Sequence, residues 1–389
     1  MTGVAGVDTG QVLRPASARL VGVDAARGVA LLGMVAIHVL PGQDADGSES
    51  LPYQVASGRS AALFAVLAGV GLALAYRRPR GPDRWRASAA LSVRAVLLGL
   101  VGLALGGLES GVAVILVYYA ALFVLGLPWL GAGPRTLLVS AAVIAAVVPL
   151  LSFAVRAGLS EPDAASPTFG DLSDPGQLAT ELLLTGYYPA LAWTAYLLVG
   201  LAVGRAALQR PRTAGVVAAA GATMALVATA LSALLLGPLG GYDRLAGVVR
   251  PAPGTTLEQA VTRSRFGNVP PDSPWWLATD APHSSTPLDL YATAGTALLV
   301  LGVALLLASR APAVLAPLTA AGSMPLTLYS LHVLLLGTTD TDDPTRYYLL
   351  QVLGGLLAAF VWRRYVGRGP LEAALAAVVR PLRAARHPR

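Results

Sequence analysis

Long apolar runs recur from near the start of the chain to near its end, and short polar segments separate them. Ten of these runs approach the roughly 20 residues that a helix needs to cross a bilayer. They lie near 20–41, 58–76, 91–108, 111–130, 134–156, 187–207, 213–236, 288–308, 314–337 and 346–362. The pattern predicts an all-α, polytopic integral membrane protein with about ten transmembrane helices.

The charged residues between the runs predict the orientation in the membrane. Arg residues cluster in 77–94, in 205–212 and in the tail from 363, whereas the alternating segments carry Asp and Glu. Short cytoplasmic loops are enriched in Arg and Lys. Ten spans place every Arg-rich segment on one side, so we predict cytoplasmic N and C termini and a multi-pass protein of the plasma membrane.

The same pattern divides the chain into three parts. Residues 1–18 are expected to form a disordered cytoplasmic tail. Residues 19–364 form the predicted transmembrane domain, with long outer loops near 157–186 and 237–287. Residues 365–389 are expected to form a basic amphipathic cytoplasmic tail on the inner membrane surface.

Composition agrees with this class. The chain of 389 residues is 55% hydrophobic and only 13% charged, whereas soluble domains carry about 25% charged residues. The net charge of +7 is explained by the Arg-rich cytoplasmic segments, so no nucleic-acid partner is expected. There is no Cys, which excludes disulfides, thiol nucleophiles and Cys metal sites.

Three ionisable residues share one stripe of the first predicted helix. Arg27 and His38 are eleven residues apart, which is three turns plus about 20°, and Asp24 lies within about 40° of the same line. Ionisable residues inside a span usually face a cavity or a partner. Two interpretations stay open: an Asp24–Arg27 pair that fixes helix depth beside a packed His38, or a functional stripe in which His38 transfers protons.

A second candidate site lies on the ninth predicted helix, where Tyr329 and His332 are three residues apart and share a face. His332 lies at a depth similar to that of His38, in the outer half of the membrane. His283 precedes the eighth helix on the same side. Three His residues toward one face could bind a metal, but their spacing does not require one, and no metal is expected.

Other candidate residues lie on the outer side. Arg59 begins the second predicted helix and either binds an anionic or carbonyl oxygen near His38 or reaches lipid headgroups. Trp275 and Trp276 are either interfacial anchors or a surface that stacks on a sugar.

Several blocks of the sequence resemble a known family. They are Asp24-Ala-Ala-Arg27-Gly28 with His38, Arg59-Ser60 to Gly71, Ile115 to Ala120, Thr185 to Arg205, Pro282-His283-Ser284, Leu328 to His332, and Gly369-Pro370-Leu371-Glu372. In this order they resemble the YeiB-like bacterial membrane proteins, which are related to the heparan-α-glucosaminide N-acetyltransferase family. The spacing of Arg27 and His38 is also similar to the first helix of the acyltransferase-3 membrane enzymes.

The resemblance implies a membrane-embedded acyltransferase that moves an acyl group, expected to be acetyl, from cytoplasmic acyl-CoA to an extracytoplasmic acceptor. On this interpretation His38 is the general base or acyl carrier, and Arg59, Tyr329 and His332 orient substrate or stabilise an oxyanion.

The other expected roles concern the two substrates. Asp24 and Arg27, with the Arg-rich 77–94 segment, are expected to hold the phosphates of the donor, acetyl-CoA. His283, Trp275 and Trp276 are expected to contact the acceptor, a glycan or other small molecule of the cell envelope.

Two other classes stay open at this stage. A transporter or exporter could use Asp24, Arg27 and His38 as a proton or substrate path, and such proteins often have interrupted helices. A membrane protein without chemistry is the third class. The bilayer is the expected partner in every case, and a homodimer is left open.

Overall fold

The structure is a computed structural model that describes residues 20–44, 47–159, 165–339 and 342–383. All the regular elements of this described part are helices, and the single β-bridge, between Gln43 and Glu49, is isolated. The predicted all-α class is therefore confirmed. The expected tail 1–18 lies outside the described residues.

Six helical segments are long and apolar enough to cross a membrane. They are α1 (Val21–Val39), α2 (Leu51–Ala56) together with α3 (Arg59–Ala75), α4 (Pro82–Gly106), α6 (Pro134–Arg156), α9 (Pro211–Leu236) and α12 (Pro287–Arg310).

Three helix pairs, each bent at a short break, pass the same test of length and composition only when taken together, as a broken span or a re-entrant loop does. The bends are 56° between α7 (Pro175–Thr180) with η3 (Glu181–Thr185) and α8 (Ala190–Val203), 80° between α13 (Ala316–Gly322) and α14 (Pro325–Thr338), and 49° between α15 (Pro344–Tyr365) and α16 (Pro370–Arg383). The described chain thus has six spans, or nine if each pair crosses once.

The tenth expected run, 111–130, forms a shorter element. α5 (Leu116–Gly126) continues into η1 (Leu127–Trp129), and together they are too short to cross a bilayer unless the bilayer thins around them. Residues 107–115 are not helical, and Gly111 has a positive φ of 73°. The prediction of about ten full spans is corrected to this extent.

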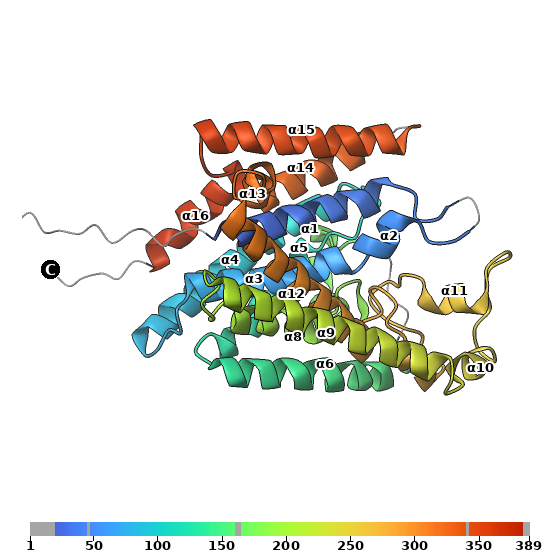
Figure 1. Cartoon of the computed structure of the whole chain (residues 1–389). Helices are drawn as coiled ribbons and strands as arrows, with labels where there is room; N and C mark the ends of the chain where they lie inside the picture. The colour runs from blue at the N-terminus through green and yellow to red at the C-terminus, as the bar shows by residue number, and fades with distance from the viewer. Residues whose placement is uncertain (1–19, 45–46, 160–164, 340–341, 384–389) are drawn as a thin grey trace, which may run out of the picture.

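Burial separates central from peripheral helices. More than half of the apolar windows of α1, α2–α3 and α12 is buried, whereas those of α6 and α9 are 22% buried. Figure 1 shows α15 and α6 at opposite edges of the bundle. Their outward faces carry exposed apolar residues, among them Val139, Leu151, Leu350, Leu353 and Leu357, which is the pattern of a lipid-facing surface.

Two of the close helix contacts depend on small residues. A Cβ added at Gly200 of α8 would meet the backbone of Val66 in α3, and one added at Gly322 of α13 would meet the backbone of Asp24 in α1. Glycine therefore lets these backbones touch, and the second contact fixes α13 against the charged first turns of α1.

The outer loops form a small cap of their own. Short helices α10 (Gly241–Leu245), α11 (Leu257–Thr262), η2 (Phe169–Ser173) and η4 (Pro274–Ala278) lie in them. Leu236, Leu245, Val261, Val269 and Trp276 form a separate buried cluster there. In Figure 1, α10 and α11 lie at the end of the bundle opposite to α16 and the α3–α4 turn, so the Arg-rich turn and the tail share one end, as their predicted cytoplasmic location requires.

Candidate functional site

A cavity of about 600 Å³ lies at the end of the bundle that carries α16 and the α3–α4 turn, a size within the range of small-molecule and cofactor sites. Helices α1, α3, α4, α5, α14 and α16 line it. Its charged lining residues are one acid, Glu372, and four Arg residues: Arg27, Arg94, Arg368 and Arg380. Most of the other lining residues are aliphatic or aromatic.

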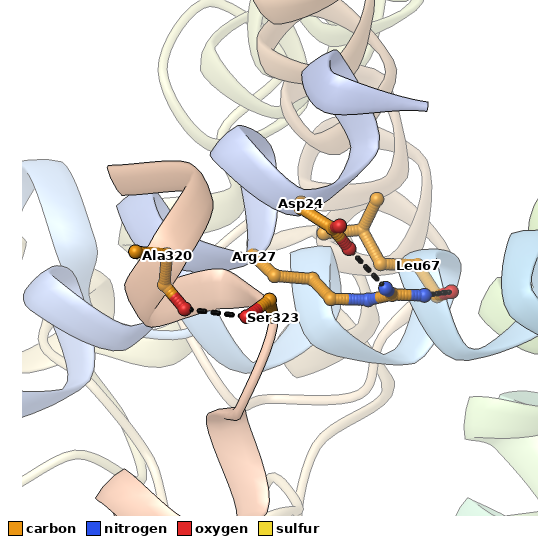
Figure 2. A network of polar contacts seen from close by, with 5 residues as sticks. All are labelled: Asp24, Arg27, Leu67, Ala320 and Ser323. Atoms are coloured by element: carbon orange, nitrogen blue, oxygen red, sulfur yellow. Dashed lines mark hydrogen bonds and ion pairs between the residues drawn. The ribbon is translucent and has the colours of Figure 1, made fainter. Parts of the chain in front are cut away.

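Arg27 is the half-buried cation of this set. Its guanidinium donates to a carboxylate oxygen of Asp24 at 2.8 Å and to the backbone oxygen of Leu67, in α3, at 3.4 Å. Figure 2 shows Arg27 extending from α1 toward α3 with these two partners at its tip. The Asp24 side chain is only 3% exposed. The predicted ion pair is therefore present, and the same Arg27 also lines the cavity.

The 77–94 segment contributes less to the cavity than expected. Of its Arg residues only Arg94 is a lining residue. Arg84 donates instead to the backbone oxygen of Pro128, and Arg86 pairs with Asp83 in solvent. The reason is that α4 already begins at Pro82, so the intervening side chains project from its exposed first turns.

Helix α16 and the turn before it supply the remaining charges. Its apolar residues Leu375, Ala376 and Val379 line the cavity between Arg368 and Arg380. The apolar side of α16 therefore covers the cavity mouth. Because Arg94, Arg368 and Arg380 are solvent-exposed, the inner end of the cavity is wet and cationic.

Glu372 fixes α16 to α14. Its carboxylate accepts hydrogen bonds from the backbone N–H groups of Leu326 and Thr327, at 2.8 and 3.2 Å, and from the Thr327 hydroxyl at 2.6 Å. The first N–H groups of a helix have no partner within the helix, and a negative charge there is favourable. Glu372 thus caps the helix that carries Tyr329 and His332.

The deep end of the cavity is apolar and aromatic. Met34, Phe64 and Tyr119 line it together with Tyr329. The Tyr329 hydroxyl accepts a hydrogen bond from the backbone N–H of Ile115 at 3.4 Å, which leaves its own hydrogen available to donate.

The two His residues of the outer half meet directly above this end. Nδ1 of His38 lies 3.0 Å from Nε2 of His332, with the ring planes within 8° of each other. Nδ1 of His332 lies 2.6 Å from Oε1 of Gln351, in α15. Neither His lines the cavity, but Met34 and Tyr329 each lie about one helical turn below them. The structure thus brings together two rings for which the sequence predicted only a similar depth, and the cavity described above does not reach either of them.

His283 lies nearby in an aromatic enclosure. Its ring is within 4.6 Å of the Tyr187 ring and 5.4 Å of the Tyr188 ring, and it stacks on Trp193 at 6.1 Å, centroid to centroid. The residue is 2% exposed, and Nδ1 has no hydrogen-bond partner among the described residues. Burial lowers the pKa of His283 to about 3, so the ring is neutral at physiological pH.

The remaining predicted residues lie further out. Arg59 donates to the backbone oxygen of Gln54 at 2.6 Å, and its charge acts on buried Asp289 of α12. Trp276 belongs to the core of the outer cap and donates to Asp272, while Trp275 packs under Arg244. Neither Trp lines the inner cavity.

Sequence reasoning missed two residues of this arrangement. Gln351 is a lone amide within an apolar run, and that isolation was its only signal. Glu372 was noticed as part of a sequence block, but its contact with α14 depends on tertiary structure. Within the described ranges no group of three His, Asp or Glu is arranged to hold a metal ion.

The arrangement combines a cationic mouth, an apolar passage, and an imidazole pair that lies about one helical turn beyond the end of that passage. Guanidinium groups bind phosphates, and an imidazole can take a proton from an attacking hydroxyl or amine near neutral pH.

Comparison with known families agrees with this chemistry. The family described as heparan-alpha-glucosaminide N-acetyltransferase, catalytic, matches residues 19–235. No match was found among curated proteins. The matched region extends from α1 through α9 and includes Asp24, Arg27, His38 and Arg59. Since the match covers more than half of the chain, the protein belongs to the heparan-α-glucosaminide N-acetyltransferase catalytic family of membrane proteins.

Proposed function

We propose that the protein transfers an acyl group, acetyl in the first instance, from cytoplasmic acyl-CoA to an acceptor on the extracytoplasmic side. The observation that carries this proposal is the inner cavity, which joins four Arg residues at a wet mouth to an apolar end one turn below His38 and His332. Family membership supports acetyl-CoA as the donor.

The donor fits the cavity by charge and polarity. The phosphates of CoA match the guanidinium groups of Arg94, Arg368 and Arg380, which act from the solvent side, and of Arg27, which acts from within. The thioester end matches the apolar passage between Phe64 and Tyr329. The Asp24 carboxylate holds Arg27 in place while its guanidinium lines the cavity.

In the chemical step His38 accepts the proton of the acceptor hydroxyl or amine. The acceptor oxygen or nitrogen forms a bond to the thioester carbonyl carbon, the C–S bond breaks, and CoA leaves as a thiolate. The Tyr329 hydroxyl donates toward the oxyanion that develops on the carbonyl. If His38 itself carries the acyl group, the same steps occur twice, first with the imidazole nitrogen as nucleophile.

The acceptor is proposed to be a glycan or another envelope molecule, since His283 and the outer cap border the imidazole pair on the outer side.

We also propose that the chain belongs to the YeiB-like branch of the family. Three blocks that support this lie beyond the matched residues: 282–284, 328–332 and 369–372. They supply His283, His332 and the Glu372 cap.

The transporter alternative is favoured by one observation, the 80° break between α13 and α14. Ser323, at this break, lines the cavity. Interrupted helices at a central site are typical of transporters. A transporter would bind its cargo without cleaving a thioester, so one assay separates the two functions.

The experiment measures thiol release from acetyl-CoA by the purified protein, together with CoA affinity by calorimetry. Wild type should bind CoA, and Arg27→Ala should weaken binding at least tenfold, because it removes a charged hydrogen-bonding group. Arg212→Ala is the matched control, since Arg212 is exposed on the same side, at the start of α9, and does not line the cavity. Unchanged CoA affinity in Arg27→Ala would remove this residue from the donor site, and no thiol release with any acceptor mixture would favour transport.

A further inference from the structure

We propose that Gln351 is a positioning residue that fixes the tautomers of His332 and His38, so that Nε2 of His38 presents a lone pair to the acceptor. The proposal rests on acyl transfer by His38 and assigns a role to a residue of α15, the last membrane-crossing helix before the tail.

The geometry is a three-membered chain. Oε1 of Gln351 lies 2.6 Å from Nδ1 of His332, and Nε2 of His332 lies 3.0 Å from Nδ1 of His38. The two ring planes are nearly parallel, at 8°, and the ring centroids are 5.2 Å apart. Both contacts are within normal hydrogen-bond distance.

The direction of each hydrogen bond follows from the first. An amide oxygen only accepts, so Nδ1 of His332 carries the hydrogen. Neutral His332 then has its lone pair on Nε2, which accepts from Nδ1 of His38. Neutral His38 is left with its lone pair on Nε2. In catalytic triads, a hydrogen bond to the ring nitrogen that does not meet the substrate sets the tautomer of the catalytic His in the same way.

The exposure of the two rings agrees with this direction of the hydrogen bonds. His332 is 3% exposed, whereas His38 is only partly buried. Nε2 of His38 makes no hydrogen bond with any described residue, so it is the ring nitrogen left to meet an acceptor. When it takes a proton, the positive charge is shared through the bond to His332, whose Nδ1–H is held by the Gln351 oxygen.

The opposite orientation of the amide makes a distinct prediction. If the Gln351 NH₂ group donated to His332, every proton in the chain would reverse and Nε2 of His38 would carry hydrogen. In that reversed arrangement, a side chain at position 351 that only accepts hydrogen bonds would disrupt the hydrogen-bonded series. In the proposed arrangement the same side chain would preserve the series. Gln351→Glu accepts but does not donate, and Gln351→Met has similar size and does neither.

The first test measures acyl-CoA turnover. Gln351→Met should lose about tenfold to a hundredfold in kcat, the loss seen when a group that orients a metal-bound His is removed, and Gln351→Glu should stay within about tenfold of wild type. Leu353→Met, two residues along α15 and 62% exposed, is the control that should leave turnover unchanged. A Gln351→Glu protein that is less active than Gln351→Met would overturn the proposal.

A pH profile provides a readout that a packing role would not move. The Gln351→Glu carboxylate should stabilise the protonated imidazole pair, so the acid limb of kcat/KM should shift to higher pH. The titratable groups acting on His38 are His332 and His283, and both are unchanged in this variant. An unshifted profile would count against the proposed chain.

Nitrogen-15 NMR of labelled His reads the tautomers without any turnover, with His38→Ala used to assign the signal. Wild type should have hydrogen on Nδ1 of His38 and none on Nε2, and Gln351→Met should give a mixture. Hydrogen on Nε2 of His38 in wild type would refute the assignment even if turnover is normal. The expected tautomer in a protein that cleaves no acyl-CoA would instead refute the proposed function alone.

Discussion

His38 and His332 form one pair but differ in access to substrate. His332 is buried and holds Gln351, whereas His38 retains partial exposure and an unengaged ring nitrogen. At the scale of single residues, the proposed chemistry depends on which ring nitrogen of the pair meets the acceptor. The chain has no Cys and no Lys, so no thiol or lysine amine can substitute for the imidazole.

His38→Ala should therefore lower acyl-CoA turnover by about 10²–10⁴-fold, the usual contribution of a general base. His332→Ala should retain measurable activity, because it removes the partner rather than the base. Turnover in liposomes is the measurement, with size-exclusion chromatography to verify folding. Wild-type turnover by well-folded His38→Ala would contradict the assignment.

His283 makes the stability of the fold depend on pH. Its pKa is about 3 in the folded protein because burial disfavours the charged ring, against about 6.5 in the unfolded chain. The unfolded state therefore binds the proton more readily, so this stabilisation is full above pH 6.5 and is lost as pH falls toward 3.

The variant that tests this is His283→Asn. Residue 283 has φ 57°, a left-handed conformation that Asn tolerates. The thermal midpoint of wild type in detergent should decline more steeply than that of the variant between pH 6.5 and 4. If the two thermal midpoints declined in parallel, His283 would bind a proton as readily in the folded protein as in the unfolded chain, which would contradict this prediction.

At the scale of elements, α14 and α16 behave as one unit through Glu372. The carboxylate caps α14 and at the same time holds α16 over the cavity mouth. Loss of a side-chain cap costs about 1 kcal/mol.

Glu372→Ala should therefore lower the thermal midpoint by a few degrees and weaken CoA binding, because α16 and the turn before it bring Arg380 and Arg368 to the cavity. Asp83→Ala is the matched control: Asp83 is an exposed acid at the same end and lies outside the cavity. Calorimetry and differential scanning fluorimetry together measure both effects. Weaker stability with unchanged CoA affinity would restrict Glu372 to capping.

The elements also mark what the sequence could predict. Helical periodicity placed Asp24, Arg27 and His38 on one stripe, and depth alone put His332 level with His38. Periodicity assigns a face but not a neighbour, so the contact with Gln351 and the covering of the cavity by α16 could not be predicted. The break before Pro325 had a local signal, since the residue before a proline avoids the helical region.

At the scale of the whole molecule, orientation in the membrane decides which substrate reaches which end. The Arg-rich α3–α4 turn and α16 lie at one end of the bundle, and the outer cap lies at the other (Figure 1). A donor that enters beside the Arg residues and an acceptor that enters beside the cap would meet between them.

Reporter fusions measure this orientation directly. Fusions at residue 82 and at the C terminus should report a cytoplasmic location, and fusions at 170, 260 and 342 should report the opposite side. A cytoplasmic signal at 260 would reverse the cap and invert the proposed donor side.

The position of α15 at the edge of the bundle has a consequence for how the lipid acts on the enzyme. Of its 22 residues only Ala359 is fully buried, so hydrocarbon chains cover most of its surface and help to set its height. A helix of this length spans about 33 Å, slightly more than a typical hydrocarbon core. A vertical shift of one residue, about 1.5 Å, would separate Gln351 from His332. Turnover should therefore pass through a maximum as acyl-chain length is varied in reconstituted vesicles, and bilayer thickness would tune the reactivity of His38 through a different helix.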